Sequence, residues 1–161
     1  MGLFQNLRFR RPIERTIQTM PNVSLDELQG AVDWVSSDVL DNEAYVCRQS
    51  GRVFWFSGDG GMADEEDIIP DDIHDVGKYV LVPDKQYLDL GITLALDFAA
   101  QYLAEQYDDV RNIFRRKGAY RRFKELLHRR ELLEKWYAYG EEHTIKALEY
   151  WCESEGLSIE R

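Results

Sequence analysis

The chain of 161 residues has few cysteines, few histidines and no long apolar run, and each shortage excludes a class of protein. Its two cysteines, Cys47 and Cys152, form no CxxC motif and have no neighbouring histidine pair, which argues against a zinc site and a disulfide scaffold. No apolar stretch approaches the roughly 20 residues that span a bilayer. We therefore expect reduced, buried thiols in a cytoplasmic protein without a transmembrane segment.

Motifs of enzyme chemistry are scarce as well. The chain contains no glycine-rich phosphate loop and no G-x-S-x-G nucleophile elbow. The string Asp71-Asp72-Ile73-His74-Asp75 offers metal-binding groups, but an exposed acidic loop is the more common origin of such a string. The sequence therefore predicts no catalytic residue, no metal ligand and no cofactor, with a hydrolase that uses an unconventional site as an alternative.

The apolar content is sufficient for one folded domain. Apolar residues make up 44% of the chain, and a chain of this length can bury about two-thirds of its unfolded surface. Residues 1–22 mix apolar side chains with four arginines and are interrupted by Pro12. We interpret them as a basic, apolar tail that is either poorly ordered or an anchor for a membrane surface or a partner. Residues 23–161 are predicted to form a single domain.

The first half of this domain is predicted to contain one helix and a small antiparallel sheet. A capping box at Ser24–Glu27 begins a helix that ends near Ser36. β-rich runs at 44–48 and 52–57 flank Gly51, which can supply the positive φ of a hairpin turn. A third strand is expected at 78–82, where Pro83 stops it.

The second half is predicted to be helical from about residue 87. Its core-facing apolar residues recur at helical spacing in three groups: Leu88, Ile92, Leu96, Ala99 and Leu103; Val110, Ile113 and Phe114; and Phe123, Leu126, Leu127 and Leu133. Gly118 can terminate the second of these helices, and a last helix is expected from about residue 141 to 155, closed by Gly156. The predicted fold class is α+β: an N-terminal helix and a β-hairpin or three-stranded sheet, followed by a C-terminal helical bundle.

The net charge of −10 conceals a strong segregation of sign. Between Arg111 and Lys135 ten bases stand against three glutamates, so this segment carries +7 and the rest of the chain −17. Eight acids and no base lie between Asp59 and Asp75. Such segregation produces strong local fields. The candidate acidic partner surface consists of Asp64, Glu65, Glu66, Asp67, Asp71, Asp72 and Asp75.

The basic segment 111–135 has three alternative interpretations. It can contact a protein partner or the phosphates of a nucleic acid, or it can be solvated or paired with the chain's own acids. The candidate binding residues are Arg115, Arg116, Lys117, Arg121, Arg122, Lys124, Arg129 and Arg130.

The run 116–127, the Trp136-Tyr137-Ala138 triplet and residues 147–153 together resemble a bacterial family, uncharacterised protein family 0158. The Gly-Ala-aromatic-Arg-Arg-Phe-Lys string of that family is matched at Gly118–Lys124 without departure. The resemblance extends over about residues 24–159. It implies a domain identity and a bacterial source, and it implies no particular activity.

Taken together, these features favour a cytoplasmic, non-enzymatic interaction or regulatory module that presents charged surfaces to a protein partner. Nucleic-acid binding through residues 111–135 is the alternative. The sequence predicts neither the identity of the partner nor the oligomeric state.

Overall fold

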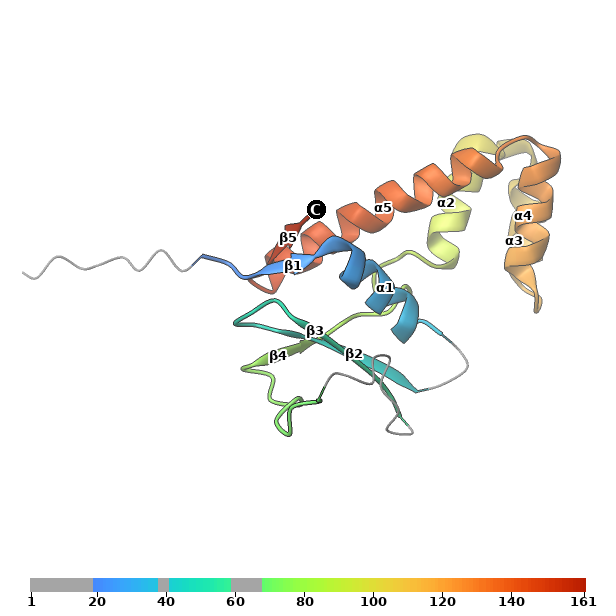
Figure 1. The fold of residues 1–161 in the computed structure, drawn as a ribbon. Coiled ribbons are helices and arrows are strands. Elements are labelled where there is room, and N and C mark those ends of the chain that lie inside the picture. The colour runs from blue at the N-terminus through green and yellow to red at the C-terminus, as the bar shows by residue number, and fades with distance from the viewer. Residues whose placement is uncertain (1–18, 38–40, 59–67) are drawn as a thin grey trace, which may run out of the picture.

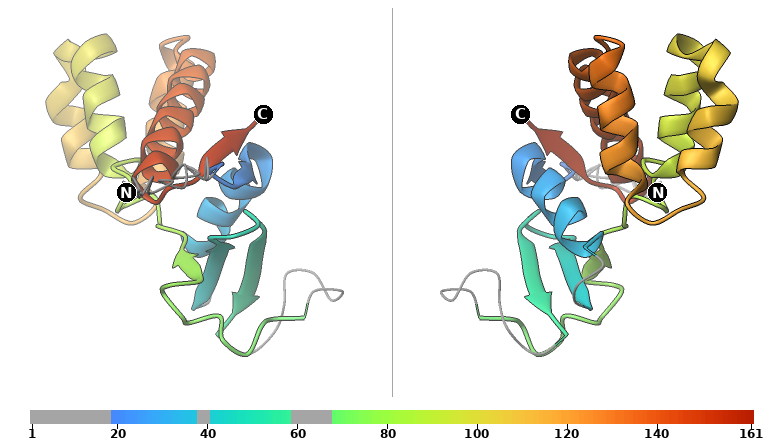
Figure 2. Two further views of the ribbon diagram at one scale, coloured as in Figure 1. Left: turned by 90° about the vertical axis from the view of Figure 1, so that its left-hand side faces the viewer. Right: turned by 90° about the vertical axis from the view of Figure 1, so that its right-hand side faces the viewer.

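A small sheet and a group of helices form two lobes that share one long helix, α5 (Leu133–Ser154), as Figure 1 shows. The structure is a computed structural model and describes residues 19–37, 41–58 and 68–161. We refer to the part that contains the sheet as the sheet lobe and to the part that contains most helices as the helical lobe. Figure 2 shows both lobes from two further sides.

The sheet lobe is built on a three-stranded antiparallel sheet with the order β3-β2-β4. Its strands are β2 (Asn42–Cys47), β3 (Val53–Ser57) and β4 (Tyr79–Leu81). Helix α1 (Leu25–Val35) begins at Ser24, whose Oγ accepts a hydrogen bond from the Glu27 N–H at 3.4 Å. The predicted helix, hairpin and third strand are therefore confirmed, each within two residues of its expected bounds.

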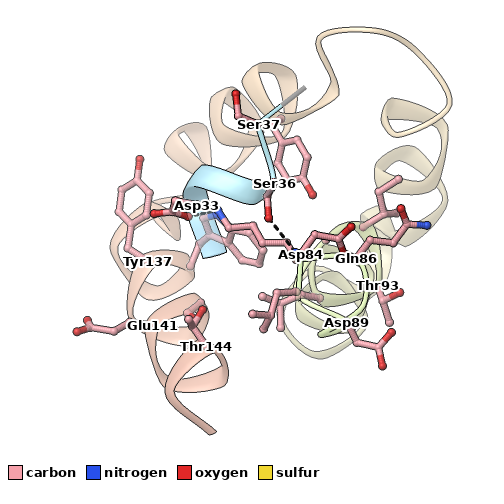
Figure 3. A pocket seen from close by; sticks show the side chains of 18 of the residues that line it. Asp33, Ser36, Ser37, Asp84, Gln86, Asp89, Thr93, Tyr137, Glu141 and Thr144 are labelled. Atoms are coloured by element: carbon pink, nitrogen blue, oxygen red, sulfur yellow. Dashed lines mark hydrogen bonds and ion pairs between the residues drawn. The ribbon is translucent and has the colours of Figure 1, made fainter. Parts of the chain in front are cut away.

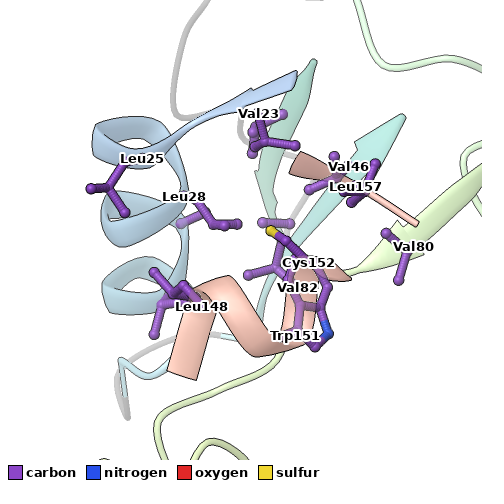
Figure 4. Packing of buried hydrophobic residues seen from close by; sticks show 14 residues of the cluster. Val23, Leu25, Leu28, Val46, Val80, Val82, Leu148, Trp151, Cys152 and Leu157 are labelled. Atoms are coloured by element: carbon purple, nitrogen blue, oxygen red, sulfur yellow. The ribbon is translucent and has the colours of Figure 1, made fainter. Parts of the chain in front are cut away.

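The core of the sheet lobe is aliphatic, with contributions from both ends of the domain. Residues of α1, the sheet and the last turns of α5 form one buried cluster (Figure 4). Its fully buried members include Val23, Leu28, Val46, Leu148 and Leu157. Because residues 23 and 157 belong to the same cluster, the packing of this lobe depends on contacts between segments far apart in the sequence.

The β2–β3 turn is tied to the N-terminal part of the domain. Gly51 has φ +76°, and its N–H donates to the Cys47 carbonyl oxygen at 2.9 Å. A Cβ atom at this position would lie only 1.9 Å from the backbone oxygen of Asn22. Both the positive φ and this close approach require glycine.

A parallel ribbon of two short strands, β1 (Asn22–Ser24) and β5 (Ser158–Glu160), closes the sheet lobe. Helix α5 leads into it through a left-handed turn at Gly156, with the Leu157 N–H donating to the Cys152 carbonyl oxygen at 2.8 Å. This hydrogen bond belongs to the Schellman motif that ends many helices. The predicted helix end at Gly156 is confirmed, whereas the ribbon was not predicted.

The core of the helical lobe combines aliphatic side chains with a cluster of aromatic rings. The lobe contains α2 (Ile92–Tyr102), the 3₁₀ turn η1 (Ala104–Gln106), α3 (Tyr107–Ile113), α4 (Ala119–Arg129) and the first half of α5. The fully buried ring of Phe98 lies at the centre, with ring centroids of Tyr102, Trp136 and Tyr139 at 4.7, 5.3 and 5.2 Å. The ring centroid of Phe123 on α4 lies 5.2 Å from that of Trp136.

Three sequence predictions about the helices were wrong in detail. Helix α5 begins at Leu133 rather than near residue 141, so Leu133 does not extend α4. Gly118 lies at the start of α4 with φ +74°, whereas α3 already ends at Ile113. Helix α2 buries Phe98 and its neighbours 94, 95 and 99, while Ile92 is 49% exposed.

No helix within the ranges that the structure describes is long and apolar enough to span a membrane.

Candidate functional site

Helices α3 and α4 form a hairpin that is basic on α4 and on the connection between the two helices. Helix α4 buries Phe123, Leu126 and Leu127, so its apolar residues occupy one face and its charged residues are directed outward. The connection between the helices, residues 114–118, carries three consecutive bases. The fold therefore concentrates the positive charge that the sequence contains in this segment.

We define the basic tip as the five bases at this connection and on the first turn of α4: Arg115, Arg116, Lys117, Arg121 and Arg122. Four of them are exposed and Arg122 is half-buried. No acidic residue occurs between Val110 and Lys124. Within the described residues the one ion pair of the tip is that of Arg121 Nε with Glu125, 4.0 Å apart, and a pair this exposed contributes little.

The remaining candidate bases lie elsewhere on α4. Lys124 has its ammonium 5.5 Å from the ring centroid of Tyr137 on α5, a cation–π arrangement. Arg129 and Arg130 are exposed at the opposite end of the helix from the tip. The eight predicted residues thus form one cluster of five and two smaller groups.

Only part of the predicted acidic surface can be placed. Asp64, Glu65, Glu66 and Asp67 lie outside the described residues. Asp71, Asp72 and Asp75 are exposed beside the sheet. Asp72 accepts a hydrogen bond from Lys78 Nζ at 2.5 Å, which lowers the pKa of its carboxyl, and Asp75 accepts from the Gly77 N–H at 2.9 Å.

The two charged regions lie at different ends of the molecule. Figures 1 and 2 show the 68–78 segment beside the sheet and the α3–α4 hairpin in the helical lobe. None of the three placed acids of this stretch, residues 71, 72 and 75, forms an ion pair with the basic tip. In the part of the chain that the structure describes, the tip is therefore not neutralised by this stretch.

A large open groove separates the lobes. Its volume is about 910 Å³, and it lies between the end of α1, the 84–91 connection, the start of α2, and helices α4 and α5 (Figure 3). Its charged lining residues are Asp33, Asp84, Lys85, Asp89, Lys124 and Glu141. We call it the interlobe groove.

A second, smaller groove adjoins the first. Its volume is about 380 Å³, and it shares Val35 and Asp84 with the interlobe groove. It extends toward the sheet, where Glu43, Trp151 and Glu155 line it. We call it the sheet-side groove.

The three histidines lie on separate elements. His74 Nδ1 is 3.1 Å from the Tyr45 hydroxyl, His128 is exposed on α4, and His143 Nδ1 is 2.8 Å from the Tyr139 carbonyl oxygen. Across residues 19–37, 41–58 and 68–161, no group of three His, Cys, Asp or Glu side chains is arranged to hold a metal ion.

The two cysteines are unpaired thiols in different environments. Burial raises the pKa of the Cys152 thiol to about 11. At half-buried Cys47, burial also opposes ionisation, but hydrogen bonds from Ser50 and the turn backbone outweigh it and lower the pKa of the thiol. Burial is confirmed for Cys152, whereas the same prediction for Cys47 holds only in part.

The Gly118–Lys124 string that carries the family resemblance now has a place in the fold, as the start of α4 beside the basic tip. A family model, Uncharacterised protein family (UPF0158), matches residues 23–159. The chain belongs to this family. UPF0158 thus covers both lobes and both grooves, and its match begins at the first residue of the predicted domain. No curated protein and no solved structure matches the chain.

Sequence reasoning found the basic segment but missed the grooves. Charge composition alone indicated the basic segment, because ten bases within 25 residues must occupy a restricted surface. The interlobe groove draws its lining from residues 33–37, 84–94, 120–124 and 136–144, and no motif connects these segments in the sequence. The pairs Asp33–Lys85 and Lys124–Tyr137 belong to its lining, and only the fold shows them.

Proposed function

We propose that this UPF0158 protein is a non-enzymatic interaction module that binds a protein partner with a negatively charged surface, and that the basic tip is its contact site. The observation that supports this most strongly is the absence of an acidic residue between Val110 and Lys124, together with the single weak ion pair that the tip forms with the residues that the structure describes. Cations that pair with no described carboxylate are available to contact another molecule.

The position of the tip favours binding as well. It lies on a helical hairpin, and the first turn of α4 adds the positive end of its helix dipole to the five side chains. Concentrated charge of this kind steers association and makes it sensitive to salt. The overall charge of −10 does not oppose this, because the placed acids of the 68–78 segment lie at the other end of the molecule.

Nucleic acid is the second candidate partner, because two exposed tyrosine rings lie near the bases of α4. Tyr120 and Tyr137 are 44% and 47% exposed, and Lys124 lies over the second of these rings. Exposed aromatic rings among cations are the surface on which single-stranded bases stack. The same residues also suit a protein interface, where tyrosine and arginine are enriched.

The test is a comparison of two triple variants in a binding assay. The tip variant carries Arg115→Gln, Arg116→Gln and Lys117→Gln. The control variant changes three cations that pair with the protein's own carboxylates, Lys78→Gln, Lys146→Gln and Arg161→Gln. Both variants lose the same charge, so a difference between them reports the location of the contact rather than the net charge.

Fluorescence anisotropy with a labelled 20-residue polyglutamate and a labelled 20-nucleotide DNA strand, at low and high salt, gives the readout. We expect the tip variant to lose about tenfold or more in affinity for polyglutamate, and the control less than about threefold. If the protein binds DNA more tightly than polyglutamate, nucleic acid becomes the favoured partner. The slope of log affinity against log salt should then fall by roughly one for each phosphate contact that the tip variant loses. Equal losses in both variants, or no binding of either probe, would refute the role of the tip.

A further inference from the structure

The two adjoining grooves have an excess of negative charge and aromatic walls. Six acids line them against two lysines: Asp33, Glu43, Asp84, Asp89, Glu141 and Glu155. Asp33 is neutralised by Lys85 at 2.6 Å, and Glu155 by Arg48 at 2.8 Å. The other four acids form no ion pair with any described residue, so the grooves attract cations.

Apolar surface accompanies this charge. In the interlobe groove, Ile92 is 49% exposed beside half-exposed Tyr120 and Tyr137. In the sheet-side groove, Tyr87 and Leu81 are exposed next to Trp151. A free cation in water would gain little from such walls, whereas the long side chains of a basic peptide bury their methylene groups against them.

One buried acceptor in the sheet-side groove has no partner. The Asn42 side chain donates from Nδ2 to the Trp34 carbonyl oxygen at 2.9 Å, which fixes the orientation of the amide. Its Oδ1 is buried and accepts no hydrogen bond from the described part of the chain. A buried acceptor of this kind is costly unless a donor reaches it. Because the protein encloses this oxygen, a ligand in the groove cannot contact it without a local rearrangement, so Asn42 is a lining residue of the groove rather than a contact.

We propose that the two grooves together bind an extended peptide segment of a partner protein in which arginine alternates with apolar residues. An arginine in the sheet-side groove can donate to the Glu43 carboxylate, and the exposed side chains of Leu81 and Tyr87 provide apolar surface for its stem. Residues on either side extend along Ile92 and Tyr137 in the interlobe groove, whose lining also includes Asp84, Asp89 and Glu141. None of the five bases of the basic tip lines this site, and the site does not depend on the function proposed for the tip, although it shares Tyr120, Lys124 and Tyr137 with the surface considered for nucleic acid.

The test uses the full chain, labelled with ¹⁵N, and a ten-residue peptide in which arginine alternates with leucine and phenylalanine. We expect saturable shifts at the Asn42 side-chain amide and at the Trp136 indole, with binding measured in parallel by calorimetry. A peptide with glutamate in place of arginine is the matched control. Shifts confined to other surfaces, or equal binding of the glutamate peptide, would overturn the proposal.

Two triple variants locate the contact. The groove variant carries Asp84→Asn, Asp89→Asn and Glu141→Gln, exposed changes that keep the shapes of the side chains. The control variant, Glu105→Gln, Asp109→Asn and Glu153→Gln, makes the same charge change at exposed positions outside the groove linings. We expect the groove variant to lose about tenfold in affinity and the control less than about threefold. Equal losses would contradict the site.

The alternative occupant is the basic tip of a second copy of this chain. Light scattering across a concentration series separates the two. A monomer that binds the arginine peptide supports the proposal. Self-association that the groove variant abolishes would assign the grooves to the second copy and overturn the assignment to a partner peptide.

Discussion

The sheet lobe and the helical lobe reach a buried core by different means. The core of the sheet lobe is mostly aliphatic and joins segments far apart in sequence, since β1 and β5 pair across the whole domain. The helical lobe packs aromatic rings from helices that follow one another in the chain. The sheet lobe is closed by backbone pairing between the two ends of the domain. The packing of the helical lobe depends instead on one cluster of rings around Phe98.

The largest effect is expected from removal of that central ring. Phe98→Ala deletes a fully buried side chain with three aromatic neighbours and should destabilise the protein by about 3–5 kcal/mol. Because α5 belongs to both cores, we expect one cooperative urea transition with a lower midpoint and an unchanged slope, followed by circular dichroism. A transition that splits into two steps would show that the lobes unfold independently.

The next effect tests the contact between the β2–β3 turn and β1. Gly51→Ala forces a Cβ atom against the Asn22 backbone oxygen in addition to the strain of a positive φ, so we expect a loss of at least about 2 kcal/mol. Gly156→Ala has nearly the same φ, +74°, but a Cβ there meets no atom within 4 Å. It should cost only about 1 kcal/mol.

Urea denaturation of both glycine variants provides the measurement. An equal loss of unfolding free energy in both variants would mean that the strain of the left-handed conformation accounts for the whole effect of Gly51→Ala. The stability of the turn would then not depend on its contact with β1.

The smallest effect concerns the corner between α4 and α5. Glu131 adopts φ 56°, which costs a residue with a side chain about 1 kcal/mol relative to glycine. Glu131→Gly should therefore stabilise the protein by roughly that amount, seen as a higher thermal midpoint. Glu134→Gly removes the same charge inside the first turn of α5 and should destabilise by about 1 kcal/mol. If both variants destabilise, the conformation of Glu131 is not a source of strain.

This corner also shows why part of the fold could not be predicted from sequence. The helix start at Ser24, the turn at Gly51 and the helix end at Gly156 use the residues that such positions favour, and all three were predicted. The corner at Glu131 uses a residue that disfavours its own conformation, so nothing in the sequence indicated that a new helix begins at Leu133. Gly140 lies inside α5 without interrupting it, although glycine is unfavourable in the interior of a helix.

Two further misses have related causes. Helix α2 is apolar on more than one side, so helical spacing alone did not distinguish the face of Ile92 from the face of Phe98. The ribbon consists of strands of three residues, which are too short for a recognisable alternation. For the candidate sites, local composition predicted the basic tip, whereas the grooves depend on how separate segments come together in the fold.

The continuity of α5 has a consequence for hydrogen exchange. Trp136 anchors its first half in the aromatic core, and Leu148 and Trp151 anchor its second half in the aliphatic core. A helix held at both ends cannot fray toward its middle, so the amide protons around residues 141–147 have no local route of opening. They should exchange with deuterium only through global unfolding and should be among the slowest amides of the molecule.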